Sequence, residues 1–242
     1  MKICTTQIKP LKGNIEGNIE SHKIFIELAA SGGADLIFFP ELSLTGYEPK
    51  LADKLAVKYD DECLNELQII SDKRNITISA GLPTRGEKGI LISMVIFQPR
   101  EVRQLYSKQY LHSDELPYFT EGEKQVILKI GGENIAPAIY YESLLPEHSE
   151  DAVKCGAGIY IASVAKPSGG LQKAFKRYPE IAKKYSMPIV MSNSVEQCSD
   201  FICAGRSSVW NGKGELLGQL DETNEGILIF DTGTEEITIR QI

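Results

Sequence analysis

The chain has 242 residues, of which 42% are hydrophobic and 24% are charged, so it is long enough to bury a substantial core as a single domain spanning residues 1-242. Its 26 Lys and Arg against 33 Asp and Glu give a net charge of -7, which offers no basic surface for nucleic acid or an anionic membrane. The five cysteines follow no C-x-x-C or Cys/His spacing, so we expect neither a disulfide framework nor a metal site, and we expect a reducing cytoplasmic location.

The first half of the chain predicts a βαβ unit followed by a hairpin. Residues 3–8 are β-prone, apolar positions from 15 to 30 follow helical spacing, and residues 36–39 form a continuous apolar run typical of a strand buried on both faces. A second amphipathic segment at 63–70 precedes strand-like runs at 76–82, 90–97 and 101–106. The N-terminus lacks a basic region before an apolar core, and no run of about 18 apolar residues occurs, so we expect no export and no membrane span.

The second half predicts a further α/β layer. Residues 126–130 and 134–139 form a strand pair, a short helix follows at about 147–154, and residues 158–162 form a buried strand. Helical spacing returns from 171 to 185, where Pro179 lacks a backbone donor and is expected to start a new turn. Strand-like runs at 188–192, 207–210, 215–220 and 226–230 predict a second sheet that closes the core.

Three strand ends carry groups that are able to do chemistry. Glu41 follows the apolar run at 36–39, Lys108 follows the run at 101–106, and Tyr140 follows the strand at 134–139. Strand ends are where α/β proteins bind ligands. Each segment has an ordinary interpretation as well: a capping or solvated glutamate, a surface lysine, and a tyrosine at the rim of the core.

Taken together, the order and content of these segments resemble the glutamate, lysine and cysteine motifs of the nitrilase superfamily of carbon-nitrogen hydrolases. The quoted stretches are Phe39-Pro40-Glu41-Leu42-Ser43, Tyr106-Ser107-Lys108-Gln109-Tyr110 and Ile139-Tyr140-Tyr141-Glu142-Ser143. The resemblance covers nearly the whole chain and includes the lead-in at 33–35 and the strand-turn-strand at 205–218. It implies a four-layer αββα sandwich, a homodimer or higher homo-oligomer, a small-molecule amide or nitrile substrate, and no cofactor or metal.

The resemblance also implies a role for each matching residue. Glu41 takes the place of the general base, Lys108 that of the cation that stabilises the tetrahedral oxyanion, and Glu115 that of the second glutamate. Tyr140 takes the place of the nucleophilic cysteine, and the backbone N–H of Tyr141 that of a second oxyanion donor. Glu142 is expected to hold neighbouring backbone.

Tyrosine at the nucleophile position is expected to impair the family reaction. A phenol has a reference pKa of about 10, and its oxygen lies roughly 3 to 4 Å farther from the backbone than a cysteine sulfur. A misplacement of about 1 Å can cost on the order of 100-fold in rate. None of the cysteines is an evident substitute, because Cys155, Cys198 and Cys203 are interpreted as buried structural thiols.

Three functional hypotheses therefore follow from the sequence. The first is an amidase-type carbon-nitrogen hydrolase, acting on a small carboxamide or ω-amide and impaired by Tyr140. The second is a non-catalytic binding or regulatory protein that keeps the same fold. The third is a different reaction in which the Tyr140 phenol acts as an acid or nucleophile, which requires a strongly lowered pKa.

Overall fold

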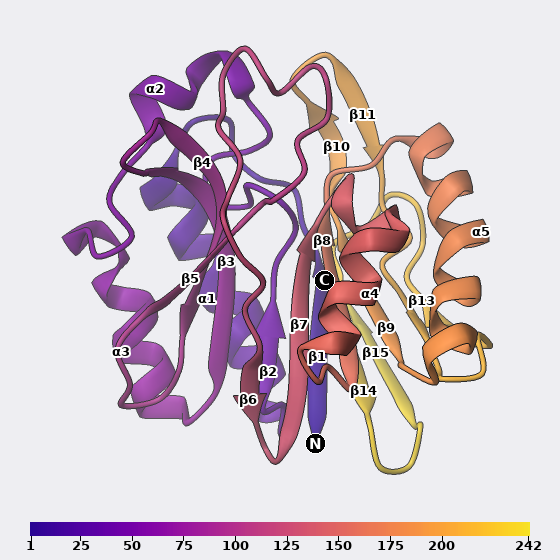
Figure 1. Ribbon diagram of the computed structural model, residues 1–242. Helices are drawn as coiled ribbons and strands as arrows, with labels where there is room; N and C mark the ends of the chain where they lie inside the picture. Colours follow the sequence, from indigo (N-terminus) through magenta and orange to yellow (C-terminus); the bar gives the residue numbers. More distant parts are fainter.

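The molecule consists of two β-sheets packed face to face, with helices covering both outer surfaces (Figure 1). The structure is a computed structural model and describes residues 1–242. Because each sheet buries one face against the other sheet and one against helices, the layers follow the order helix, sheet, sheet, helix. The αββα sandwich expected from the sequence is confirmed.

The first sheet has seven strands in the order β15-β14-β1-β2-β3-β4-β5. Its strands are β1 (Lys2–Gln7), β2 (Leu36–Phe38), β3 (Thr77–Arg85), β4 (Ile90–Phe97), β5 (Gln104–Ser107), β14 (Gly226–Asp231) and β15 (Ile237–Gln241). Strands β1, β2 and β3 are parallel, and the crossovers between them contain α1 (Ile15–Ser31) and α3 (Asn65–Arg74). The predicted βαβ opening and the predicted hairpin, formed by β4 and β5 around residues 98–100, are confirmed.

The second sheet has six strands in the order β13-β12-β9-β8-β7-β6. Its strands are β6 (Leu128–Ile130), β7 (Glu133–Ile139), β8 (Ile159–Val164), β9 (Ile189–Asn193), β12 (Ser208–Trp210) and β13 (Leu216–Gln219). Strands β7, β8 and β9 are parallel and are joined through α4 (Pro146–Lys154) and α5 (Ser168–Tyr185). Figure 1 shows α4 and α5 on one side of the molecule, and α1 and α3 on the other.

Shorter elements connect these layers. They are η1 (Pro49–Leu51), α2 (Ala52–Leu55), η2 (Glu62–Leu64), η3 (Glu142–Leu144), and a two-stranded hairpin of β10 (Val195–Cys198) and β11 (Phe201–Ala204). The sequence did not predict this hairpin. No helix has both the length and the apolar character needed to cross a bilayer.

The C-terminal strands depart from the prediction of one closing sheet. Strands β12 and β13 do join the second sheet, but β14 returns to the first, where it pairs antiparallel with β1 and places Ile3 opposite Phe230. Strand β15, which was not predicted, then pairs with β14. The alternation of apolar residues indicates that a segment is a strand but does not indicate its partner, and only the packed structure supplies that information.

Helix α5 also differs from the prediction, because it continues through Pro179 without a break. A proline inside a helix removes one backbone hydrogen bond. Buried residues on both sides of it, Tyr178 and Ile181, anchor this turn against the second sheet. Packing of the apolar face therefore outweighs the local penalty.

Three hydrophobic clusters fill the three interfaces between layers. The central cluster contains 26 buried residues and includes side chains from both sheets, such as Phe38 and Ile161. The outer clusters contain 20 buried residues on the side of α1 and α3 and 15 on the side of α4 and α5. Strands β2 and β8 are buried throughout, and β7 is buried from Ile135 to Ile139, which fixes the position of the residues that follow these strands.

Candidate active site

Glu41 lies in the turn that follows β2. The carbonyl of Phe39 accepts a hydrogen bond from Ser163 Oγ at 2.8 Å, which ties this turn to the second sheet. The Glu41 side chain is buried; its Oε1 accepts from Lys108 Nζ at 2.9 Å, and its Oε2 has no hydrogen-bond partner. Burial raises the pKa of Glu41 to about 8, against the opposing effect of the Lys108 ammonium.

Lys108 follows β5 and is the centre of a buried ionic cluster. Its backbone is fixed by hydrogen bonds from its N–H to Ile92 O at 2.9 Å and from Gly122 N–H to its carbonyl at 2.7 Å. Its Nζ donates to Glu41 Oε1 at 2.9 Å and to Glu115 Oε1 at 2.6 Å, and all three side chains are fully buried. Burial by itself lowers the pKa of Lys108, but the two carboxylates outweigh it and raise the pKa to about 12.

Glu115 completes this cluster from the loop after β5. Its Oε1 accepts a hydrogen bond from the Tyr47 hydroxyl at 3.0 Å, in addition to the one from Lys108. Its Oε2 accepts from the backbone N–H of His112 at 2.7 Å. Both carboxylate oxygens are thus used, and Glu115 holds the Lys108 ammonium in place.

Tyr140 ends β7 with a left-handed backbone, φ 47°, which is uncommon for a bulky residue. Its N–H donates to Ser163 O at 2.9 Å. Its ring is partly exposed and lies against two lysines, with the ring centroid 4.8 Å from Lys108 Nζ and 4.2 Å from Lys166 Nζ. Burial chiefly raises the pKa of the phenol to about 12, which is opposite to the direction that chemistry at the phenol requires.

Tyr141 and Glu142 shape the turn after Tyr140. The backbone N–H of Tyr141 donates to no protein acceptor. Glu142 is buried and accepts backbone hydrogen bonds from Ile139 at 2.8 Å, Gln109 at 2.6 Å and Tyr110 at 3.2 Å. As the sequence predicted, Glu142 holds backbone; it fastens the segment after Lys108 to the end of β7.

Lys166 is the residue of the site that the sequence did not indicate. It follows β8, its backbone makes two hydrogen bonds with the Asn193 side chain, and its buried Nζ donates only to Tyr140 O at 3.2 Å. Burial lowers the pKa of Lys166 to about 7, and the nearby Lys108 ammonium lowers it further while Glu41 opposes. The sequence feature that could have indicated Lys166 as a site residue is its position at the end of a buried parallel strand, β8, which pairs with β7.

Aromatic rings surround Tyr140. The centroid of its ring lies 6.4 Å from that of Tyr47 and 6.2 Å from that of His112. Tyr47 in turn lies 5.5 Å from Phe201, which belongs to the β10–β11 hairpin. The hairpin that the sequence missed therefore forms part of the wall around the site.

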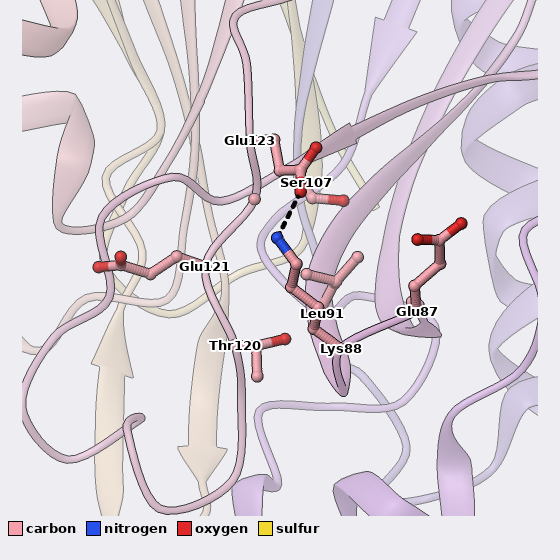
Figure 2. A pocket seen from close by; sticks show the side chains of 9 residues that line it. Glu87, Lys88, Leu91, Ser107, Thr120, Glu121 and Glu123 are labelled. Carbon is pink, nitrogen blue, oxygen red and sulfur yellow. Dashed lines mark hydrogen bonds and ion pairs between the residues drawn. The ribbon is translucent and has the colours of Figure 1, made fainter.

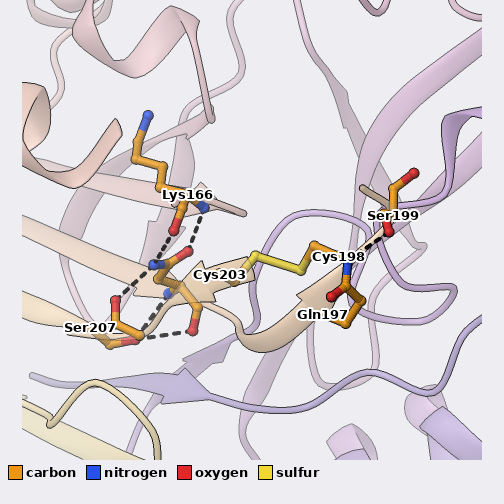
Figure 3. Close-up of a disulfide and its surroundings, with 8 residues drawn as sticks. Lys166, Gln197, Cys198, Ser199, Cys203 and Ser207 are labelled. Atoms are coloured by element: carbon orange, nitrogen blue, oxygen red, sulfur yellow. Dashed lines mark hydrogen bonds between the residues drawn. A yellow bond between two sulfur atoms is a disulfide. The ribbon is translucent and has the colours of Figure 1, made fainter. Parts of the chain in front are cut away.

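The cysteine predictions were wrong for three residues. Cys198 and Cys203 form a disulfide across the β10–β11 hairpin, with a Cα–Cα distance of 6.1 Å (Figure 3). The hairpin register brings the two thiols together, although their sequence spacing carries no disulfide signature. Cys155 is exposed and not buried, as is Cys63, whereas Cys4 is a buried thiol.

A polar surface pocket of about 280 Å³ lies between the β3–β4 turn and residues 120–123, and its walls carry the Lys88–Glu123 ion pair at 2.9 Å (Figure 2). Ser107 and Gly122 line it, but none of the predicted site residues does. No group of three or more His, Cys, Asp or Glu side chains is arranged to hold a metal ion.

Solved structures share this architecture. An amidase from Nesterenkonia, described as a member of the nitrilase superfamily, superimposes with a TM-score of 0.87 at 23% identity, covering 95% of this chain and 90% of the amidase. At that level of identity the similarity establishes the α/β fold, with its two mixed sheets flanked by helices, and nothing finer.

Curated relatives and a family model match most of the chain. It is 24% identical to the glutamine-dependent NAD(+) synthetase of Thermotoga maritima and 26% identical to that of Synechocystis, over 98% of this chain but only 42% and 47% of those proteins. The chain thus spans less than half the length of these relatives. It is also 22% identical to the omega-amidase YafV of Escherichia coli over 58% of this chain and 55% of that protein. The model of the carbon-nitrogen hydrolase family matches residues 2–238, and the chain belongs to that family.

Proposed function

We propose that this chain carries the amide-hydrolysing site of its family with the nucleophile position occupied by Tyr140, and that hydrolysis of a small carboxamide or ω-amide is impaired as a result. One observation carries the proposal. The Tyr140 ring lies 4.8 Å from the ammonium of Lys108, whose other two contacts are the carboxylates of Glu41 and Glu115.

The arrangement supports a different role for each of Glu41, Lys108 and Glu115. A thiol becomes a good nucleophile when a base removes its proton, and Glu41 has a buried carboxylate oxygen without a partner that is suited to this task. Lys108 stays charged, and the backbone N–H of Tyr141 is free, so both can stabilise an oxyanion. Glu115 positions Lys108.

Tyr140 cannot supply the missing thiol. Its pKa is raised to about 12, so the phenol stays protonated at neutral pH. Its oxygen sits at the far end of a ring whose face is turned to the two lysines. These two facts support impairment of the reaction.

The test is the release of ammonia from glutamine, butyramide, nitriles and carbamoyl compounds by the unmodified chain and by Tyr140→Cys. Glutamine is included because two relatives are named as glutamine-dependent synthetases, and butyramide because a Nesterenkonia amidase structure is described in complex with it. We expect Tyr140→Cys to hydrolyse at least one carboxamide faster than the unmodified chain, by on the order of 100-fold.

Two control variants make the result specific. Tyr140→Ala opens the same space without a thiol, and Tyr140→Cys with Glu41→Gln keeps the thiol without the base; we expect both to be inactive. Fluoroacetamide should label Cys at position 140, because its acetamide moiety adds to the active site cysteine of the Nesterenkonia amidase. A folded Tyr140→Cys chain that neither hydrolyses any amide nor is labelled by fluoroacetamide would contradict the proposal.

The second candidate is a non-catalytic binding protein. The observation in its favour is that the Tyr140 ring already occupies the space against Lys108 and Lys166. This candidate predicts that the unmodified chain shows no turnover. Saturable hydrolysis by the unmodified chain that Glu41→Gln abolishes would exclude it.

A further inference from the structure

Two buried lysines contact the same tyrosine ring in opposite surroundings. Lys108 has two carboxylates within hydrogen-bonding distance, whereas Lys166 has no carboxylate within 4.0 Å and only one acceptor, the Tyr140 carbonyl at 3.2 Å. An ammonium has three N–H donors, so a charged Lys166 leaves two of them unsatisfied in a buried place. The neutral amine suits this environment, and a neutral amine is a nucleophile.

Five ionisable side chains act on the Lys166 amine. The Tyr140 ring covers its Nζ at 4.2 Å, and the charges of Glu41 and Glu115 favour its ammonium form. The charges of Lys108 and of Lys173 on α5 disfavour it. Burial dominates and brings the pKa to about 7, and a lysine that is desolvated beside another cation is the usual form of an amine that reacts with carbonyl groups.

A second observation indicates that the site is built for a ligand. Glu41 is 1% exposed, and its Oε2 is buried with no hydrogen-bond partner. An orphaned carboxylate oxygen in the interior is costly unless something else donates to it. The backbone of Lys166 is held by Asn193 and Ala204, and its side chain extends away from the Cys198–Cys203 disulfide, so the one contact that its amine makes within the fold is the hydrogen bond to the Tyr140 carbonyl (Figure 3).

We propose that Lys166 is a covalent binding residue: its amine, buried beneath the Tyr140 ring, condenses with the carbonyl carbon of a small aldehyde or ketone to form an imine. Tyr47 and His112 flank the Tyr140 ring that covers the amine, and Phe201 lies against Tyr47, so an apolar or aromatic substituent that extends past the Tyr140 ring would meet aromatic surfaces. This function is separate from amide hydrolysis and needs no thiol.

The step balances without an oxidant or a reductant. The Lys166 nitrogen forms a bond to the carbonyl carbon, and the carbonyl oxygen becomes a hydroxyl, with Lys108 stabilising its developing negative charge. Glu41, protonated below a pKa of about 8, donates a proton to that hydroxyl, which leaves as water as the C=N bond forms. The nitrogen loses two protons in all: the first makes the carbonyl oxygen a hydroxyl, and the second passes to Glu41 as the C=N bond forms, which replaces the proton that Glu41 gave to the leaving water.

The experiment treats the unmodified chain at pH 7 with benzaldehyde or propanal and sodium cyanoborohydride, which converts an imine into a stable secondary amine, and then locates modified lysines by peptide mass spectrometry. We expect Lys166 to be modified ahead of the exposed Lys176 by on the order of 1,000-fold, because an ordinary lysine has a pKa of about 10.4 and is almost entirely protonated at pH 7. We also expect the rate at Lys166 to rise with pH to a midpoint near 7.

Three variants test whether the fast modification occurs at the Lys166 amine. Lys166→Arg keeps a cation but cannot form an imine, so the fast modification should vanish, whereas Lys176→Arg should leave it unchanged. Tyr140→Ala uncovers the amine and should accelerate modification. If Lys166→Arg does not fold, the pH dependence of the rate of Lys166 modification in the unmodified chain still tests the proposal.

Three results would overturn the proposal. They are modification of Lys166 no faster than that of Lys176, a midpoint near that of an ordinary lysine, and modification only in Tyr140→Ala, which would mean that the ring seals the amine in the natural chain. The hydrolysis test is made on Tyr140→Cys and this one on the unmodified chain, so the two proposals fail independently.

Discussion

At the scale of single residues, the site buries the carboxyl groups of Glu41 and Glu115 with two amines, and the contacts that each group makes determine its charge. Lys108 shares its ammonium between two carboxylates and stays charged, whereas Lys166 has none within 4.0 Å and its pKa falls to about 7. Glu41 has one satisfied oxygen and one orphan, and its pKa rises. Opposed shifts in one site are typical of acid and base pairs.

The sequence predicted some of these residues and not others, for a physical reason. Glu41, Lys108 and Glu115 lie in segments with a recognisable order, and the structure joins them within 3 Å. Lys166 lies in no such motif, because its character comes from burial beside the Tyr140 ring. The functional roles of Glu41, Lys108, Glu115, Tyr140 and Tyr141 are predictions that the tests above address.

His22, on α1, gives a residue-scale prediction about acid stability. It is buried, its Nδ1 lies 2.6 Å from Asn18 O and its Nε2 3.0 Å from Ser43 Oγ, and burial lowers its pKa to about 3. In the unfolded chain this histidine binds a proton near pH 6.5, whereas in the folded chain it does not. The free energy of unfolding therefore falls as pH drops below about 6.5. His22 should contribute a loss of about 2 kcal/mol between pH 6.5 and 5.

Urea unfolding at these two pH values, for the wild type and His22→Gln, measures this contribution. Gln keeps a donor for Asn18 and an acceptor for Ser43 but does not titrate. The wild type should therefore lose about 2 kcal/mol more than the variant on acidification. Parallel losses in the two proteins would show that His22 is not the group responsible.

At the scale of elements, strands and helices with strong periodicity were predicted well, and the errors have local causes. The β10–β11 hairpin was missed because its alternation is short and its burial incomplete. The prediction that a new turn starts at Pro179 was wrong because tertiary packing keeps α5 helical through this residue. Both features depend on neighbours that are distant in sequence.

Strand β3 positions Glu41 through Gly81, which yields an element-scale prediction. A Cβ at Gly81 would lie 2.6 Å from Leu42 N and 3.0 Å from Pro40 O, so the turn that carries Glu41 sits directly on this glycine. Gly81→Ala should push that turn away, lowering the unfolding free energy by roughly 1–3 kcal/mol. In the Tyr140→Cys background it should also reduce amide hydrolysis.

Gly169, in the first turn of α5, is the matched control. A Cβ there meets nothing within 4 Å, so Gly169→Ala should stabilise the chain by roughly 0.5–1 kcal/mol through helix propensity. Chemical denaturation measures both changes. Equal effects of the two substitutions would contradict the close approach of β3 and the Glu41 turn.

At the scale of the whole molecule, the central cluster takes side chains from both sheets, so neither sheet can bury its inner face without the other. We therefore predict that residues 1–242 unfold as one cooperative unit. Two natural probes report on opposite outer layers. Trp210, the single tryptophan, lies in the cluster under α4 and α5, and the buried Cys4 thiol lies in the cluster under α1 and α3.

In a chain with Cys63→Ser and Cys155→Ser, which removes the exposed thiols, Trp210 fluorescence and Cys4 labelling should give the same urea midpoint. Cooperative unfolding exposes both layers together, which is the physical reason for this expectation. Circular dichroism in the same titration serves as the control. Separate midpoints for the two probes would mean that the layers unfold independently and that the chain is not a single domain.

The sequence by itself determined the layers, most strand and helix positions and the resemblance to carbon-nitrogen hydrolases, and it predicted that Tyr140 takes the place of the family's cysteine. These depend on the order and spacing of residues along the chain. Only the tertiary structure decided that β14 returns to β1, that Cys198 pairs with Cys203, and that the amine of Lys166 is buried against Tyr140. These three features depend on which segments, distant in sequence, lie next to each other in the folded chain. The charge of a buried group in particular is set by its distances to the neighbouring charges.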